Sequence, residues 1–325
     1  MKKLVLHLGA HRCGSTAIQS LLRREHTALA GEGIGVFLRA DMETGGFDLR
    51  RLHRYRSLNP VWRSKLTKTA RAVEMMQQQT LVVSEENIMG TMPAVRSSQF
   101  YPHFSSLVQS LVKLSQLMRE PLTIAPRLVV RRQDHYLESV YAFRVARGLA
   151  VGFDDFVKAA TRTRISWLKL VRSFDGVPSS IELSVGILEA WPKPTAGAKA
   201  LEFLIGDNTI DLSQRRLTGN TRRSALELGF MLAMNRAKID WRGADWMDDV
   251  LGNLQADGGG KTAAEYALKE SLNAAAYKRF ERYYSSADKL GFDDQQRGLF
   301  IESYREENKQ FLQMDIVRSP VSVWS

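Results

Sequence analysis

Residues 3–22 read KLVLHLGAHRCGSTAIQSLL: a short apolar run, a loop between two glycines, and an apolar-periodic segment. The run over 3–8 predicts a buried strand that ends at Gly9, and the pattern after Gly14 predicts a helix from Ser15 onward. Glycines let the backbone approach a ligand closely, and the free N–H groups at a helix start form an anion site. The stretch therefore predicts a phosphate cradle on the first βα turn of an α/β sheet. A plain glycine turn into a core helix is the alternative.

The loop shares its glycine spacing with the P-loop of nucleotide triphosphatases, G-x-x-x-x-G-K-[ST], in which the lysine reaches the β- and γ-phosphates. Gly9 and Gly14 match that spacing, but Ser15 stands where the lysine is needed. The cation of this loop is Arg12, two residues before Gly14. That position suits a phosphate or sulfate near the loop mouth better than a γ-phosphate.

The segment Arg12-Cys13-Gly14-Ser15-Thr16 resembles the first loop of the sulfotransferase family, which reads roughly Lys-Thr-Gly-Ser/Thr-Thr after a strand. The resemblance implies a bacterial-type, P-loop-like sulfotransferase fold that binds 3′-phosphoadenosine 5′-phosphosulfate (PAPS). Its phosphosulfate would contact His11, Arg12, Cys13, Gly14, Ser15 and Thr16. Arg12 replaces the family's lysine, which changes the hydrogen-bond geometry, and Cys13 replaces its threonine, which removes a hydroxyl. A thiol beside a cation at a helix start has the setting that lowers its pKa, so a cysteine nucleophile is an alternative to a small space-filling residue.

A second segment, LVVRRQDHYLESVY over residues 128–141, places an arginine at the end of a predicted strand and a serine eight residues later on the next helix. A guanidinium forks onto phosphate oxygens, and a hydroxyl donates to them. The segment resembles the family's 3′-phosphate signature, which implies that Arg131 and Ser139 hold that phosphate. The family also closes a loop over the 3′-phosphate before a later helix, which implies a contact from Arg222 or Arg223; helix capping by Ser224 is the alternative.

An apolar run at 80–84, TLVVS, predicts a buried parallel strand that ends at Glu85-Glu86-Asn87. Ligand groups in open α/β sheets lie at the carboxyl ends of the strands, so both carboxylates are candidates for a general base. Similar sulfotransferases carry Ser-Ser-Glu-Asn at this place, which implies Glu86 as the base. The position alone leaves Glu85 open, and capping of the next helix is the alternative for either residue.

The whole chain of 325 residues, 44% hydrophobic, is expected to form one sulfotransferase-like α/β domain over 1–325. We expect a central parallel sheet flanked by helices, helical insertions near 48–78 and 240–290, and a helical C-terminal part. Further strands are predicted at 34–38, 122–124, 127–130 and 180–185. A single cysteine and the lack of an apolar run of about 18 residues indicate a soluble, cytoplasmic protein without a membrane span. The histidine spacing predicts no metal site, and His7 is expected to be a packed core residue.

The net charge is +11, and residues 50–71 are basic without one acidic side chain. Such a surface fits a polyanionic cofactor, an acidic acceptor, nucleic acid or a membrane surface. With the resemblance, it predicts transfer of the sulfuryl group from PAPS to a hydroxyl acceptor, a carbohydrate or glycolipid, without metal and without nucleic acid. Glu86 would accept the proton and Arg12 would stabilise the departing phosphate of the product, 3′-phosphoadenosine 5′-phosphate (PAP). The alternatives are a P-loop kinase that uses ATP and a non-catalytic polyanion-binding protein that uses residues 50–71.

Overall fold

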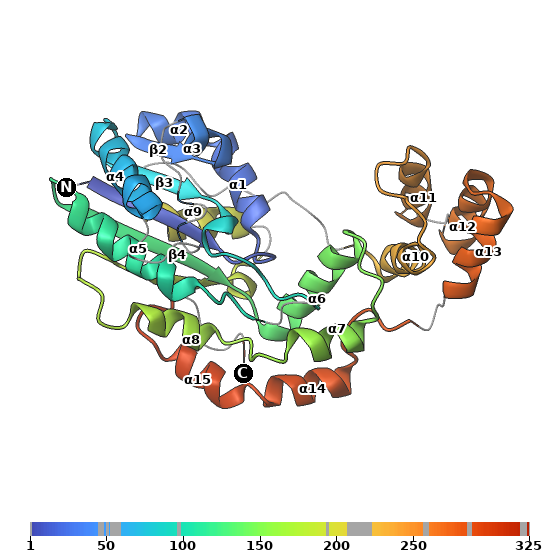
Figure 1. The fold of residues 1–325 in the computed structure, drawn as a ribbon. Helices are drawn as coiled ribbons and strands as arrows, with labels where there is room; N and C mark the ends of the chain where they lie inside the picture. The colour runs from blue at the N-terminus through green and yellow to red at the C-terminus, as the bar shows by residue number, and fades with distance from the viewer. Residues whose placement is uncertain are drawn as a thin grey trace.

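The computed structural model describes residues 2–44, 49, 52, 60–95, 99–192, 195–206, 223–255, 260–284, 288–318 and 324. At its centre lies a five-stranded parallel sheet in the order β2-β3-β1-β4-β5 (Figure 1). The strands are β1 (Lys2–Gly9), β2 (Ile34–Phe37), β3 (Thr80–Ser84), β4 (Leu122–Val130) and β5 (Ser184–Ile187). The central strands are almost wholly buried, as continuous apolar runs in parallel sheets are. The predicted α/β class with a central parallel sheet flanked by helices is confirmed.

Helices occupy most of the rest of the described chain. The α-helices are α1 (Ser15–Arg24), α2 (His26–Gly31), α3 (Arg39–Thr44), α4 (Pro60–Met75), α5 (Phe104–Leu117), α6 (Gln133–Val145), α7 (Phe153–Ala160), α8 (Trp167–Val171), α9 (Ala196–Ile205), α10 (Ala225–Arg236), α11 (Trp246–Gln255), α12 (Gly260–Ser271), α13 (Ala274–Tyr283), α14 (Asp294–Glu302) and α15 (Arg305–Leu312). Short 3₁₀-helices are η2 (Glu86–Ile88), η3 (Arg172–Phe174) and η4 (Leu188–Ala190). None of the helices in the described part of the chain is both long and apolar enough to cross a membrane.

The strand order indicates a ligand site at the carboxyl ends of two neighbouring central strands, β1 and β4. From β1 the chain leaves toward β2 and β3 on one side, whereas from β4 it leaves toward β5 on the other. Right-handed crossovers then put α4 and α5 on one face of the sheet and α1 and α9 on the opposite face (Figure 1). Because the connections after β1 and β4 diverge, ligands of open α/β sheets are expected at the carboxyl ends of these two strands, and this place is called the crevice below.

The last strand differs from its prediction because of a proline. The strand expected at 180–185 is β5 at Ser184–Ile187, and Ile181 forms only an isolated bridge with Ile124. The two pieces expected at 122–124 and 127–130 are one strand, β4, which runs through Pro126. Proline has no N–H to continue the ladder toward β5, and the side chain of Arg127 donates instead to the carbonyl of Glu182 at 2.9 Å. Regular pairing with β5 therefore starts only after that position.

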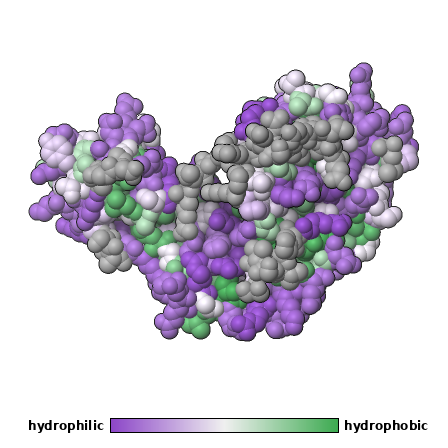
Figure 2. Space-filling model, turned by 180° about the vertical axis from the view of Figure 1, so that it is seen from behind, coloured by the Kyte–Doolittle hydropathy of each residue, from purple (hydrophilic) through white to green (hydrophobic). Residues whose placement is uncertain are grey.

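The helical insertions are present with different boundaries. Helix α4 lies within 48–78, and α11 to α13 lie within 240–290. These three helices and α10 stand beside the part that holds the sheet (Figure 1), and from behind the surface is hollowed between the two parts, with mainly hydrophilic side chains around the hollow (Figure 2). Residues 41–44 belong to α3.

Candidate active site

The loop after β1 requires its two glycines for separate reasons. A Cβ on Gly9 would lie 2.7 Å from the Cβ of Ser15, so only glycine permits the chain to return this closely. Gly14 has φ 83°, and Arg12 also has a positive φ, 69°. For a residue with a side chain this conformation is uncommon and costs about 1 kcal/mol or more. The loop is therefore held in a strained shape by contacts around it.

Helix α1 begins at this loop without a side-chain cap. Its N-cap is Gly14, and no side chain accepts a hydrogen bond there. The amides of a helix's first turn have no carbonyl partner within the helix, so those of Ser15 and Thr16 are donors at the positive end of the helix dipole. Two other amides of the loop are occupied: the N–H of His11 donates to the Tyr101 hydroxyl at 2.9 Å, and that of Cys13 donates to the Ala10 carbonyl at 3.0 Å.

Of the two interpretations of Cys13, the small space-filling residue agrees with the structure and the nucleophile does not. Its side chain is fully buried in the apolar core, and this burial raises the pKa of the thiol well above its usual range. The nearby charge of Arg131 acts in the opposite direction but does not prevail. Cys13 therefore packs as a small apolar residue and is not a nucleophile. The sequence left both interpretations open because helix starts lower a thiol pKa only where the sulfur points to solvent or a cation.

Arg12 and Ser139, predicted from separate segments, are in contact. The Nε of Arg12 donates to the Oγ of Ser139 at 3.2 Å, and its guanidinium lies 5.3 Å from the ring centroid of Phe143, one turn further along α6. Burial and the like charge of Arg131 lower the pKa of Arg12. Two guanidinium groups thus converge at the end of β1 and β4, beside the uncapped start of α1.

Arg131 is held by a carboxylate that sequence reasoning missed. Its Nε lies 3.5 Å from Oε1 of Glu189, which follows β5. The same carboxylate accepts from the backbone N–H of Arg132 at 3.1 Å and contacts Nδ1 of His135 at 3.2 Å, and Trp324 donates to its other oxygen at 3.4 Å. Burial acts to raise the pKa of Glu189, but the contacts with His135 and Arg131 lower it overall. Nothing local in the sequence around Glu189 identifies this role, because its partners come from distant segments.

The structure separates the two candidate carboxylates after β3. Glu85 is buried, and its Oε1 accepts from the backbone N–H of Asn87 at 3.1 Å as the cap of η2. Glu86 is only half-buried, and its Oε2 accepts from the side chain of Gln19 at 2.7 Å. The capping alternative therefore holds for Glu85. Glu86 is the carboxylate that remains at the crevice.

His11 belongs to the loop and is near enough to Glu86 for that charge to act on its pKa. Its Nδ1 is 3.3 Å from the Tyr101 hydroxyl, and its ring is stacked at 6.0 Å from that of Tyr101. Burial lowers the pKa of His11, whereas the nearby charge of Glu86 opposes the shift. His11 is thus a neutral imidazole near pH 7. Tyr101, whose own φ is 45°, supports the strained loop from below and was not singled out by the sequence.

The predicted contact from Arg222 lies outside the described residues. Next to it, Ser224 and Glu227 form a capping box at the start of α10, and Arg223 pairs with Glu227 at 3.1 Å. The capping alternative for Ser224 is therefore confirmed.

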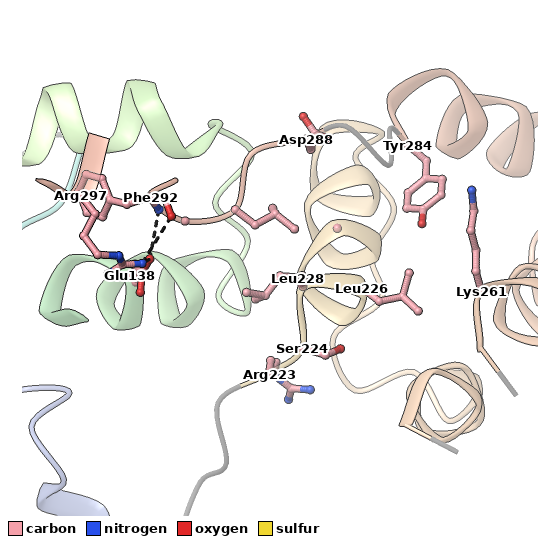
Figure 3. A pocket seen from close by; sticks show the side chains of 14 residues that line it. Glu138, Arg223, Ser224, Leu226, Leu228, Lys261, Tyr284, Asp288, Phe292 and Arg297 are labelled. Carbon is pink, nitrogen blue, oxygen red and sulfur yellow. Dashed lines mark hydrogen bonds and ion pairs between the residues drawn. The ribbon is translucent and has the colours of Figure 1, made fainter. Parts of the chain in front are cut away.

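A cavity of about 770 Å³ adjoins this helix start (Figure 3). Its apolar wall contains Leu226, Leu228, Leu290 and Phe292, and its charged residues include Glu138, Arg223, Lys261, Asp288 and Arg297. Figure 3 shows Arg297 reaching Glu138 at one end, with Lys261 and Tyr284 at the other. Neither Arg12 nor Glu86 lines it.

Comparisons with protein-family models, with curated proteins and with solved structures found no match to this chain.

Below the loop, His7 is a buried histidine whose protonation opposes folding. It is fully buried in β1, its Nδ1 lies 2.7 Å from the Oγ of Ser84, and burial lowers its pKa to about 4. An unfolded histidine titrates near 6.5, so the unfolded state takes up the proton first as the pH falls. The stability due to neutral His7 is present above about pH 6.5 and is lost between there and pH 4.

We expect the free energy of unfolding of the wild type to fall by about 2 kcal/mol more than that of His7→Gln when the pH changes from 7 to 5. Glutamine can hydrogen-bond Ser84 but does not titrate. Urea unfolding at both pH values measures the difference. The exposed His103, changed to glutamine in the same way, should leave the wild-type pH dependence intact. Equal pH dependence of the wild type and His7→Gln would contradict the assignment.

Proposed function

We propose that this protein is a PAPS-dependent sulfotransferase. The observation that carries the proposal is the convergence of Arg12, Arg131 and Ser139 at the uncapped start of α1. Glu189 lies beside Arg131, whereas Arg12 has no ion-pair partner among the described residues, so an anion beside Arg12 would offset the repulsion between the two cations. A ligand with phosphate groups at both ends of a nucleoside would satisfy both the helix start and the pair of arginines.

The residues present fit such a ligand better than ATP. Ser15, at the position of the P-loop lysine, is buried against Gly9 and has no charge to offer a γ-phosphate. Arg12, held by Ser139, reaches toward α6 instead of along the loop. The amides of α1 and Arg12 would hold the 5′-phosphosulfate, and Arg131 with Ser139 would hold the 3′-phosphate. When bound, PAPS supplies an activated sulfuryl group.

In this proposal Glu86 accepts the proton of an acceptor hydroxyl while that oxygen forms its bond to sulfur. The bond between sulfur and the bridging oxygen of the 5′-phosphate breaks, and its electron pair remains with PAP. Arg12 and the first amides of α1 stabilise the negative charge that develops on that phosphate, as in phosphoryl transfer. A neutral His11, beside Glu86, can donate a hydrogen bond to a sulfuryl oxygen. The acceptor we propose is a hydroxyl of a carbohydrate or glycolipid.

The first test is calorimetric binding of PAP, ATP and AMP, each with and without magnesium. We expect PAP to bind independently of magnesium and more tightly than AMP, because only PAP has the 3′-phosphate. Preference for ATP with magnesium would favour a P-loop kinase. If none of the nucleotides binds, the polyanion-binding alternative is favoured. That function would use basic side chains exposed on α4, namely Arg63, Lys68 and Arg71.

Changing Arg131 to methionine should weaken PAP binding by about 10- to 100-fold, since a hydrogen bond to a charged group contributes about 1.5–3 kcal/mol. AMP affinity should change little, because AMP lacks the 3′-phosphate. The exposed Arg162, changed to methionine, removes the same charge and should alter neither affinity. Equal losses for PAP and AMP would show that Arg131 does not read the 3′-phosphate.

A further inference from the structure

The half-buried side chain of Gln19 links the anion site to the candidate base. Gln19 lies on α1, four residues after Ser15, and its Nε2 is 2.7 Å from Oε2 of Glu86. The same nitrogen lies 3.5 Å from the carbonyl oxygen of Ser84, the last residue of β3. Both neighbours accept hydrogen bonds, so the amide nitrogen and not its oxygen faces them.

The helix that presents the anion-binding amides therefore also fixes the carboxylate. The rise of an α-helix, 1.5 Å per residue, puts Gln19 about 6 Å from Ser15 along the axis. A rigid helix of this length sets a constant separation between an anion at its start and the group that Gln19 holds. Glu86 is the first residue of η2, Glu85 is the cap of that 3₁₀-helix, and Gln19 donates to the Glu86 side chain from α1.

We propose that Gln19 is a positioning residue: it fixes one oxygen of Glu86 so that the other meets the acceptor hydroxyl at a set distance from the sulfuryl group. The inference rests on the proposed sulfotransferase function. Gln19 does not exchange a proton and does not contact the transferred group. Its contribution is orientation, and misplacement of a reacting group by about 1 Å costs on the order of 100-fold in rate.

The test is a double-mutant cycle on turnover of PAPS to PAP, with water or the best hydroxyl acceptor of a panel. Gln19→Met keeps the length of the side chain and removes both donors. We expect it to lower kcat by about 10- to 100-fold and to leave PAP affinity unchanged. In the Glu86→Gln background the same change should have no effect beyond about twofold, because the group that Gln19 positions is gone.

A structural role for Gln19 predicts a different pattern. A damaged helix α1 would lower kcat by the same factor in both backgrounds and would weaken PAP binding, and either result overturns the inference. Arg23→Met, on the exposed side of the same helix, should change neither quantity and controls for the substitution. A second variant, Gln19→Glu, sets a like charge beside Glu86, with His11 and Tyr101 as the other titratable neighbours. The acidic limb of the pH profile of kcat for Gln19→Glu should move to higher pH, because two close carboxylates share a proton.

The proposed function fails separately from this inference. Wild-type protein that does not bind PAP, or that binds it and does not turn over PAPS, overturns the sulfotransferase proposal and the role of Gln19 with it. If the wild type turns over PAPS but the kcat losses of Gln19→Met and Glu86→Gln are additive in the double mutant, only the role of Gln19 is overturned.

Discussion

Replacing Glu86 with glutamine is expected to lower turnover of PAPS by about 10²- to 10⁴-fold, the range that general-base catalysis contributes. Glutamine has nearly the same shape, and it cannot take a proton from the acceptor hydroxyl. PAP affinity should remain that of the wild type, because Glu86 contacts Gln19 and not the arginines at the ends of β1 and β4. Steady-state kinetics for kcat and calorimetry for PAP separate the two quantities.

Glu85→Gln is the matched control for Glu86→Gln, because it makes the same substitution in the neighbouring glutamate. Glu85 is buried and caps η2, so its replacement should reduce stability while leaving the chemistry of folded protein within a few-fold of the wild type. A larger loss of kcat per folded molecule in Glu85→Gln than in Glu86→Gln would reverse the assignment of the base. Full activity of Glu86→Gln would remove the carboxylate from the mechanism.

The largest expected effect on stability comes from Arg297, far from the base. Its two terminal nitrogens pair with Asp134 and with Glu138, the latter at 2.7 Å, and both carboxylates on α6 are almost completely buried. Removing the cation from a buried ion pair costs about 3–5 kcal/mol, because the buried carboxylate loses charge that offsets its burial. In a variant without Arg297, Asp134 still pairs with Arg132 at 2.8 Å, whereas Glu138 loses its ion pair with Arg297. Arg297→Met should therefore lower the free energy of unfolding by about 3–5 kcal/mol.

Chemical denaturation measures this change, and Arg305→Met supplies the comparison. Arg305 pairs with Glu302 on the surface, where both side chains are more than half exposed, so its removal should cost below about 1 kcal/mol. Equal effects of the two substitutions would mean that the Arg297 network does not hold α14 on α6.

The sequence predicts the parallel sheet well, because buried strands depend on local patterns. Apolar runs ending at Gly9, at Glu85 and at Arg131 were sufficient to locate three central strands and the loops at their carboxyl ends. The β5 boundary was wrong because the missing N–H of Pro126 acts through the ladder to the next strand, an effect invisible in the pattern of either strand alone.

The sequence identified several residues of the candidate site, but it did not predict which residues contact one another. The structure brings Arg12 to Ser139 and leaves Glu86 at the crevice, but Gln19, Tyr101 and Glu189 owe their places to tertiary neighbours. The sequence left two roles open for Cys13, because a helix start lowers a thiol pKa only if the side chain points outward, and orientation within a tight loop cannot be read from composition.

The far edge of the sheet has a further consequence for the physical behaviour of the chain. Beyond β5, the N–H of Val185 donates to the carbonyl of Ile316, and the N–H of Arg318 donates back to Val185, both within 2.9 Å. The segment at 316–318 thus covers backbone groups that an open edge strand would offer to another molecule. Shortening the protein before this segment would expose the backbone groups of Val185 as a template for strand pairing with another molecule.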